Sequence, residues 1–280
     1  MNMKRLIYIL SILFVFPISI YADEVPRAFL KVQYEYQHAY KIKNDTDTLW
    51  SNYKFILQIA KDASHFYDPQ KYYVDSLRLA PSGIYDQLFG EAMSRPGDYL
   101  QNKKDLGIQP GHSYINIKHF DKGDIEVWNS AVGDKHHYHL EMNDMDWEIC
   151  DSTKLILGYE CQLAEADYHG RRWKAWFTPE IPMQDGPWQL CGLPGLILEA
   201  SSGPMFSFKA TGIQTCDEIF KMPLEQEKYF NSKRKSFLKT KKYILDNLGA
   251  QISAMTGGAV TANPNANSVW TELIETDYHE

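Results

Sequence analysis

The residues in this chain that are best suited to chemistry lie in a short histidine-rich run, Lys135-His136-His137-Tyr138-His139-Leu140-Glu141. Because side chains alternate between the two faces of a strand, His137, His139 and Glu141 would share one face if this run is extended. Two imidazoles and a carboxylate suit zinc or copper. A single strand rarely closes a coordination shell, however, and Lys135 on the same face favours a solvated surface. We therefore predict no metal and no cofactor, and keep a metal-dependent hydrolase that uses these three residues as the alternative function.

Familiar catalytic motifs are absent from the sequence. Neither the nucleophile-elbow motif G-x-S-x-G nor the zinc-helix motif H-E-x-x-H occurs. The chain carries 36 Asp and Glu against 29 Lys and Arg, which gives a formal net charge of −7. An acidic protein repels phosphate, so a nucleic acid is excluded as a partner. We predict no catalytic residue.

Large aromatic side chains gather in the second half of the chain, at Trp173, Trp176, Phe177 and Trp188. Such side chains combine a rigid apolar surface with a polar edge, which suits contact with a hydrophobic ligand or a protein partner. These four residues are our candidates for a binding surface. They favour a non-catalytic binding or accessory module over an enzyme.

The same region contains the run Gly192-Leu193-Pro194-Gly195-Leu196-Ile197. The two glycines permit positive φ or the close approach of another backbone, and the proline between them fixes its own φ. The run contains no nucleophile or acid–base pair. An apolar strand follows it where a phosphate-binding loop would have a helix N-terminus. We interpret it as an architectural corner that leads a strand into the core.

This corner also carries a family resemblance. Preceded by AWFTPEIPMQDGPWQLC and by the strand Gly158–Ala164, it resembles the signature of the GLPGLI family of exported Bacteroidetes proteins, whose biochemical role is undefined. The resemblance covers residues 158–200. It implies association with TonB-dependent outer-membrane receptors in some members, and so a role in the cell envelope. The chain departs from the family at its end, where Asn263-Pro264 is followed by a longer acidic tail.

The N-terminus predicts export. Lys4 and Arg5 precede a nearly unbroken apolar run, and Ala22 offers a small residue for cleavage, as in a secretory signal peptide over residues 1–22. No cysteine lies near the cut, so no lipid anchor is expected. We expect the protein in the periplasm or associated with the outer membrane, with a single domain over residues 23–262 and a C-terminal tail over residues 263–280.

Cysteine usage agrees with an oxidising compartment. Cys150, Cys161, Cys191 and Cys216 form an even set, so two disulfides with three possible connectivities are expected. Their spacing does not match a zinc site. Cys161 and Cys191 flank the central strands, and we predict that they pair.

The elements that must position these residues are mostly strands. Alternating patterns over residues 32–40 and 53–59 predict a first hairpin, and His169-Gly170 marks the turn of another. Between them, residues 68–92 show two apolar stripes of helical period that would cover one face of a sheet, followed by a loop over residues 95–111.

A long helix is predicted over residues 223–248. Phe230, Phe237, Ile244 and Leu248 form its apolar stripe, and lysines dominate its other surface. That lysine-rich surface is interpreted as solvated, with peripheral contact to anionic lipid or an acidic partner as the alternative.

We therefore predict an α+β fold: a mainly antiparallel, curved, half-barrel-like β-sheet with a helical insertion and a long C-terminal helix. This layout is similar to the half-barrel carriers of the bacterial envelope that hold acyl chains in an apolar concavity.

Overall fold

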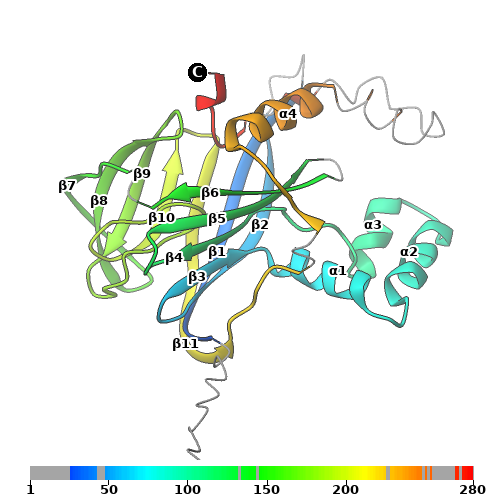
Figure 1. The fold of residues 1–280 in the computed structure, drawn as a ribbon, viewed down its shortest axis with the longest axis horizontal. Helices are drawn as coiled ribbons and strands as arrows, with labels where there is room; N and C mark the ends of the chain where they lie inside the picture. Colours follow the sequence, from blue (N-terminus) through cyan, green and yellow to red (C-terminus); the bar gives the residue numbers. More distant parts are fainter. Residues whose placement is uncertain are drawn as a thin grey trace, which may run out of the picture.

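The computed structural model describes residues 26–42, 48–131, 134–142, 145–224, 228–247, 250, 253, 269–270 and 273–279 (Figure 1). The predicted signal peptide, residues 1–22, lies outside the described residues, as does much of the predicted tail. Among the described helices, none has the length and apolar character needed to cross a membrane.

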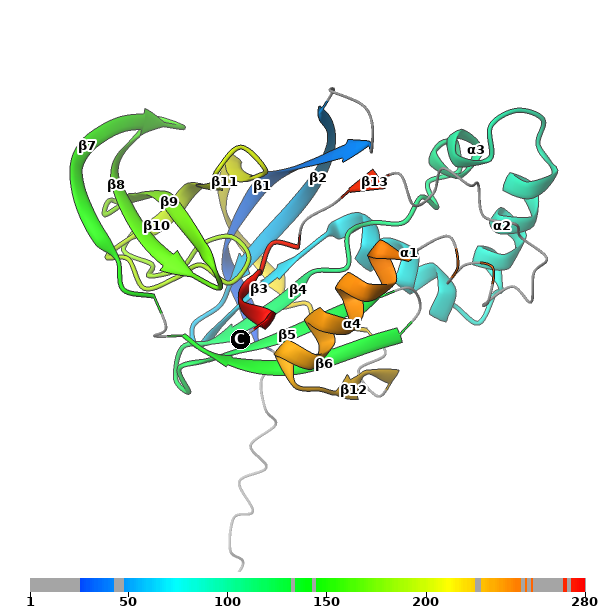
Figure 2. The ribbon, with the colours of Figure 1, turned by 90° about the horizontal axis from the view of Figure 1, so that it is seen from above.

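The described strands form one 13-stranded sheet, which is antiparallel except where β12 meets β6. Its order is β12-β6-β5-β4-β3-β2-β1-β11-β10-β9-β8-β7, with β13 paired to β1 beside this path. Figures 1 and 2 show the sheet curling on itself. The predicted mainly antiparallel sheet is therefore confirmed. The strands are β1 Arg27–Ile42, β2 Thr48–Ile59, β3 Ala63–Tyr67, β4 Ile115–His119, β5 Asp124–Ala131, β6 Asp134–Glu141, β7 Glu148–Ile156, β8 Tyr159–Tyr168, β9 Arg171–Thr178, β10 Leu196–Ser202, β11 Phe206–Ile219, β12 Phe230–Asn231 and β13 Val269–Trp270.

Protein side chains fill the inner face of the curled sheet. The main core joins residues of β1–β3 and β8–β11 with residues of the corner loop, which we define as residues 179–195. A second core packs β5 and β6 against the last helix and the C-terminal residues 273–279. Leu273 and Ile274, which belong to the predicted tail, are both buried in these cores. The concave side of the sheet is thus occupied by the chain itself.

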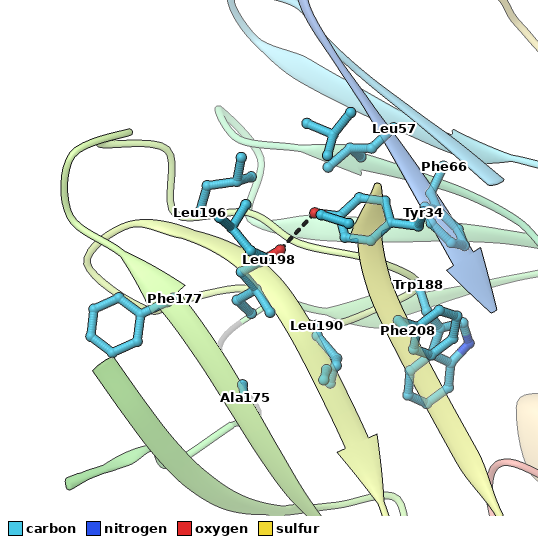
Figure 3. Packing of buried hydrophobic residues seen from close by; sticks show 14 of the residues in the cluster. Tyr34, Leu57, Phe66, Ala175, Phe177, Trp188, Leu190, Leu196, Leu198 and Phe208 are labelled. Carbon is cyan, nitrogen blue, oxygen red and sulfur yellow. Dashed lines mark hydrogen bonds between the residues drawn. The ribbon is translucent and has the colours of Figure 1, made fainter. Parts of the chain in front are cut away.

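The corner loop forms as its sequence predicts. Gly192 has a φ of +90°, a conformation open to glycine. A Cβ on Gly195 would lie 2.6 Å from the carbonyl carbon of Thr178, so a close backbone approach requires glycine there. Leu196 then enters β10, and the Tyr34 hydroxyl donates a hydrogen bond of 2.6 Å to the Ile197 carbonyl (Figure 3). Both glycines therefore have the architectural roles we expected.

The helical insertion differs from the prediction in two ways. It contains three helices, α1 Pro69–Leu79, α2 Ile84–Ser94 and α3 Tyr99–Asp105, and α3 lies where a loop was predicted. The Asp98 side chain caps α3 by accepting from the Gln101 N–H at 2.8 Å, a start signal that the preceding Pro-Gly pair obscured. The three helices also project from one side of the sheet instead of covering its face (Figures 1 and 2).

The C-terminal helix is shorter than predicted. Helix α4 spans Arg234–Asp246, and Phe230 is 65% exposed in strand β12 instead of lying on a helix stripe. Leu248 lies outside the described residues. The physical reason is pairing with β6, since the Ser232 N–H donates to the His137 carbonyl at 2.9 Å. Pairing of β12 with the distant strand β6 has thus overridden the helical preference of the segment around Phe230.

The predicted Cys161–Cys191 disulfide is not formed, and all four cysteines are free. Cys161 lies on β8 in the main core, whereas Cys191 lies in the corner loop within the second core. The Cys191 thiol donates instead to the Met142 carbonyl at 3.5 Å. Burial raises the pKa of both thiols to about 11, so neither is a thiolate at neutral pH.

Candidate functional site

A cleft of about 880 Å³ opens at one end of the sheet. The β2–β3 and β4–β5 turns meet there with the start of β1 and the residues that follow β11, because adjacent antiparallel strands bring these ends to one edge. We call this feature the end cleft. It is lined by Pro26, Arg27, Ala60, Lys61, Asp62, Ala63, His119, Asp121, Lys122, Phe220 and Met222.

The floor of the end cleft is apolar. Ala28, Ala60, Ile117 and Phe220 form a separate buried cluster there, with exposures from 0% to 5%. The Phe220 N–H donates to the Pro26 carbonyl at 2.8 Å, which fixes the ring over the strand ends. Ile117 of β4 brings this cluster to the outer face of β3–β6, which we define as the face opposite the main core.

The rim of the end cleft is polar and carries both charges. The β2–β3 turn contributes Lys61 and Asp62, and the β4–β5 turn contributes Asp121 and Lys122. Among the described residues that line it there is no serine, threonine or cysteine, and therefore no hydroxyl or thiol nucleophile. An apolar floor with a charged rim suits a ligand that has an apolar body and a polar end, and the volume lies within the usual range for ligand pockets.

The four aromatic candidates lie elsewhere, around the main core. Trp173, Phe177 and Trp188 are at most 2% exposed, and the rings of Trp173 and Trp188 are 5.4 Å apart between centroids. Trp176 is half-buried, and the Lys154 ammonium lies 4.3 Å from its ring centroid. Of the four, only Trp176 presents surface to solvent. Alternation along β9 could predict which ring faces inward, but it could not predict that the corner loop covers the inner face.

The histidine candidates are partly brought together. His137 and His139 share the outer face of β6, with ring centroids 4.8 Å apart. The carboxylate beside them is Glu126 of β5, and one donor atom from each of these three residues lies within 4.8 Å of the others. Glu141 is opposite Asp124 at the end of the β5–β6 pair and is not part of this group. The predicted ligand set is corrected accordingly, and His136 points to the other face, where its ring lies 4.8 Å from Phe237.

Sequence reasoning missed Glu126 because the partner strand of β6 was not assigned. Glu126 lies directly opposite His139 in the β5–β6 register. The polar alternation Asp124, Glu126 along β5 was the available signal. It identifies the facing residue only once the register of the pair is known.

A buried charged cluster ties α4 to the C-terminal residues. Arg234 donates to Glu275 at 2.7 Å and to Asp277 at 2.8 Å, and His169 lies 3.4 Å from Asp277. Burial lowers the pKa of His169 to about 4 and the pKa of Lys241 to about 8. A cavity of about 380 Å³ beside this cluster includes His169, Arg234 and Asp277 in its lining. The geometry holds the chain end in place.

Comparison with known protein families finds a match for only part of the chain. Residues 170–199 match the model of a family described as "Protein of unknown function (Porph_ging)". These residues include all of β9, the corner loop and the start of β10. No match to a curated protein is found.

Among solved structures, the chain is similar to PNGF-II in a P21 crystal form, with 11% identity and a TM-score of 0.46 over 77% of this chain and 33% of that one. The chain thus spans about a third of the length of PNGF-II. It is also similar to the LolA superfamily protein NE2245 from Nitrosomonas europaea, with 9% identity and a TM-score of 0.25 over 72% of this chain and 94% of that one. The family match, in contrast, covers only residues 170–199, that is β9, the corner loop and the start of β10.

Proposed function

We propose that the chain is an exported, non-catalytic binding module of the cell envelope that holds a hydrophobic ligand with a polar end group in the end cleft. The observation that carries this proposal is the cleft itself, about 880 Å³ with Ala60, Ala63, Phe220 and Met222 among its lining residues. A long-chain fatty acid has the matching chemistry, since its chain suits the floor and its carboxylate suits Lys61 or Lys122.

The filled concavity supports this location. Carriers of half-barrel form would place a ligand on the inner face, but here the corner loop, α4 and residues 273–279 occupy that face. Met222 at the mouth of the end cleft is 43% exposed, so it presents apolar surface that a ligand would cover. Burying such surface contributes about 25 cal/mol per Å².

Binding of palmitate to the purified protein tests the proposal, read by displacement of a fluorescent apolar probe. Met222→Glu puts a negative charge at the mouth, where it repels the carboxylate and disfavours the apolar chain, and we expect it to weaken palmitate binding about tenfold or more. Met93→Glu is the matched control, because Met93 is 63% exposed on α2, away from the cleft. Equal affinity in the two variants, or no saturable binding in the parent protein, refutes the proposal.

Trp176 provides a second location for the same ligand. It is the solvent-accessible member of the aromatic group that the sequence singled out. If Trp176→Ala weakens palmitate binding while Met222→Glu does not, the ligand sits on β9 and the end cleft is not the site. The opposite result supports the end cleft.

Export, membership of the GLPGLI family and association with an outer-membrane receptor belong to the same proposal. They rest on the signal-like N-terminus and on the resemblance around residues 192–197. Cell fractionation tests export, and a pull-down from native envelopes with mass spectrometry of proteins and lipids tests the receptor and the ligand together. Recovery of the full-length precursor in the cytosol contradicts the location.

A further inference from the structure

The outer face of β5 and β6 carries a group of metal-ligating side chains. Glu126, His137 and His139 each contribute one donor atom to a set whose members lie within 4.8 Å of one another. In a tetrahedral site with N and O ligands at about 2.0–2.2 Å from the zinc ion, the donor atoms lie about 3.3–3.6 Å apart. Rotations of the three side chains would have to bring the donors of this group that close. The three residues come from two neighbouring strands, so the sheet fixes their relative positions.

The hydrogen bonding of His137 leaves the lone pair of its Nε2 facing a carboxylate oxygen of Glu126. Its Nδ1 lies 3.1 Å from the Asn231 Oδ1, and because an amide oxygen only accepts, Nδ1 carries the proton in this orientation of the Asn231 amide. In the neutral ring Nε2 is therefore an acceptor. It is buried without a hydrogen-bond partner, and it lies 3.6 Å from the Glu126 Oε2, which is also an acceptor. A cation between these two atoms satisfies both.

His139 is oriented in the same way. Its Nδ1 lies 2.9 Å from the Asp124 Oδ2, which accepts the Nδ1 proton and leaves Nε2 as the free donor atom for a metal. A carboxylate that holds the far nitrogen of a histidine is the usual support of a metal ligand, since it fixes the tautomer and raises the basicity of the ring. Glu126 is supported as well, because His119 Nε2 lies 3.2 Å from its Oε1.

We propose that Glu126, His137 and His139 bind a zinc ion, with Asp124, Asn231 and His119 as the groups that orient these ligands. Two imidazoles and one carboxylate suit zinc, and three protein ligands leave the fourth position for water or for a ligand atom. The site lies beside the end cleft, because His119 both lines the cleft and contacts Glu126. It also joins β5 to β6 near the β12 edge.

Zinc titration of the purified protein, freed of any affinity histidines, tests this proposal by calorimetry at pH 7.5. We expect one zinc ion per chain, and a loss of affinity of at least about tenfold in His137→Gln and in Glu126→Gln. Asp124→Asn is expected to weaken binding about tenfold through His139, as supporting groups of metal ligands do. Cobalt gives a second readout, since a four-coordinate site produces a visible absorption band that zinc then displaces.

Two neighbouring residues provide the controls. Glu141→Gln removes a carboxylate from the same face of β6, outside the group, and His136→Gln removes a histidine from the opposite face. Both variants should bind zinc like the parent protein. The proposal is overturned if the parent binds no stoichiometric zinc, or if Glu141→Gln lowers the affinity as much as Glu126→Gln.

Discussion

Lys118 and Asp185 form a buried ion pair that holds the corner loop to the sheet. The Lys118 side chain is 1% exposed and the Asp185 side chain is fully buried, with 2.6 Å between Nζ and Oδ1. Lys118 also donates to the carbonyls of Gly186, at 2.7 Å, and Leu190, at 3.1 Å. All three of its protons are therefore used on one loop. We expect Lys118→Met to be among the most destabilising single substitutions in the chain.

The magnitude follows from the groups that the substitution leaves behind. Removing one partner of a buried ion pair costs about 3–5 kcal/mol, because the other charge stays buried and uncompensated. The Gly186 carbonyl and the Leu190 carbonyl would also lose their donor, at about 1 kcal/mol each. The loss of about 5–7 kcal/mol that these costs imply is comparable with the whole stability of many domains, about 5–15 kcal/mol. Lys118→Met should therefore unfold at much lower denaturant concentration, or fail to fold at ambient temperature.

Urea unfolding followed by tryptophan fluorescence measures this effect, since Trp188 in the corner loop and Trp173 beneath it are both buried. The matched control is Lys154→Met. Lys154 pairs with Glu199 at 2.7 Å, but the two side chains are 34% and 26% exposed. Pairs that solvent reaches contribute about 0–1 kcal/mol, so this control should lose little.

Asp185→Asn is the milder companion if Lys118→Met does not fold. It keeps the shape of the side chain but leaves the Lys118 ammonium without its counter-charge. The double variant, Lys118→Met with Asp185→Asn, should lose less free energy of unfolding than the two single variants lose together. We expect the difference to be about 2–3 kcal/mol. Equal losses in Lys118→Met and Lys154→Met would refute this reasoning, because only the Lys118 pair is buried and only Lys118 also donates to two loop carbonyls.

Two further predictions test the corner and the C-terminal cluster. Gly195→Ala should destabilise the fold by more than about 3 kcal/mol, since its Cβ would meet the Thr178 backbone. The Cβ of Gly192→Ala would make only an ordinary contact with the Trp147 ring, at 3.9 Å, so this variant should cost about 1–2 kcal/mol for its left-handed φ. Urea unfolding ranks the two variants. Burial lowers the pKa of His169 from 6.5 to about 4, so its neutral ring stabilises the fold above pH 6.5, and up to about 3 kcal/mol is lost as the pH falls to 4. His169→Asn tolerates the φ of +52° and should flatten the stability profile in that window, while unchanged slopes contradict the assignment.

Local patterns predicted the strands around the corner well. Alternation and the His169-Gly170 turn identify β8 and β9, and the apolar run from Leu196 leads into β10 as expected. These elements are set by short-range signals: turn residues, proline, glycine and a two-residue period. The apolar stripe of helical period likewise predicted α1, and the structure shows Asp68 capping that helix ahead of Pro69.

Features that depend on strand register could not be predicted from local sequence patterns. Lys118 lies in a run, Ile-Asn-Ile-Lys-His, whose alternation fits a strand with one solvated face. The lysine is buried because the corner loop, almost 70 residues later, supplies three acceptors to its ammonium. Glu126 could not be predicted as a candidate metal ligand for the same reason, since only the β5–β6 register places it opposite His139. No local pattern encodes which distant segment covers a face.

The corner loop also determines where a ligand can bind. Its own residues, including Trp188, Leu190 and Leu193, fill the inner face of the curled sheet with side chains at most 1% exposed. A half-barrel fold by itself would suggest an apolar concavity as the binding site, but opening that space here means breaking the Lys118–Asp185 anchor. A ligand bound on the inner face would therefore loosen the loop and expose Trp188, whereas a ligand in the end cleft would leave its fluorescence unchanged. Palmitate binding with no shift in tryptophan emission is the result that the end cleft requires.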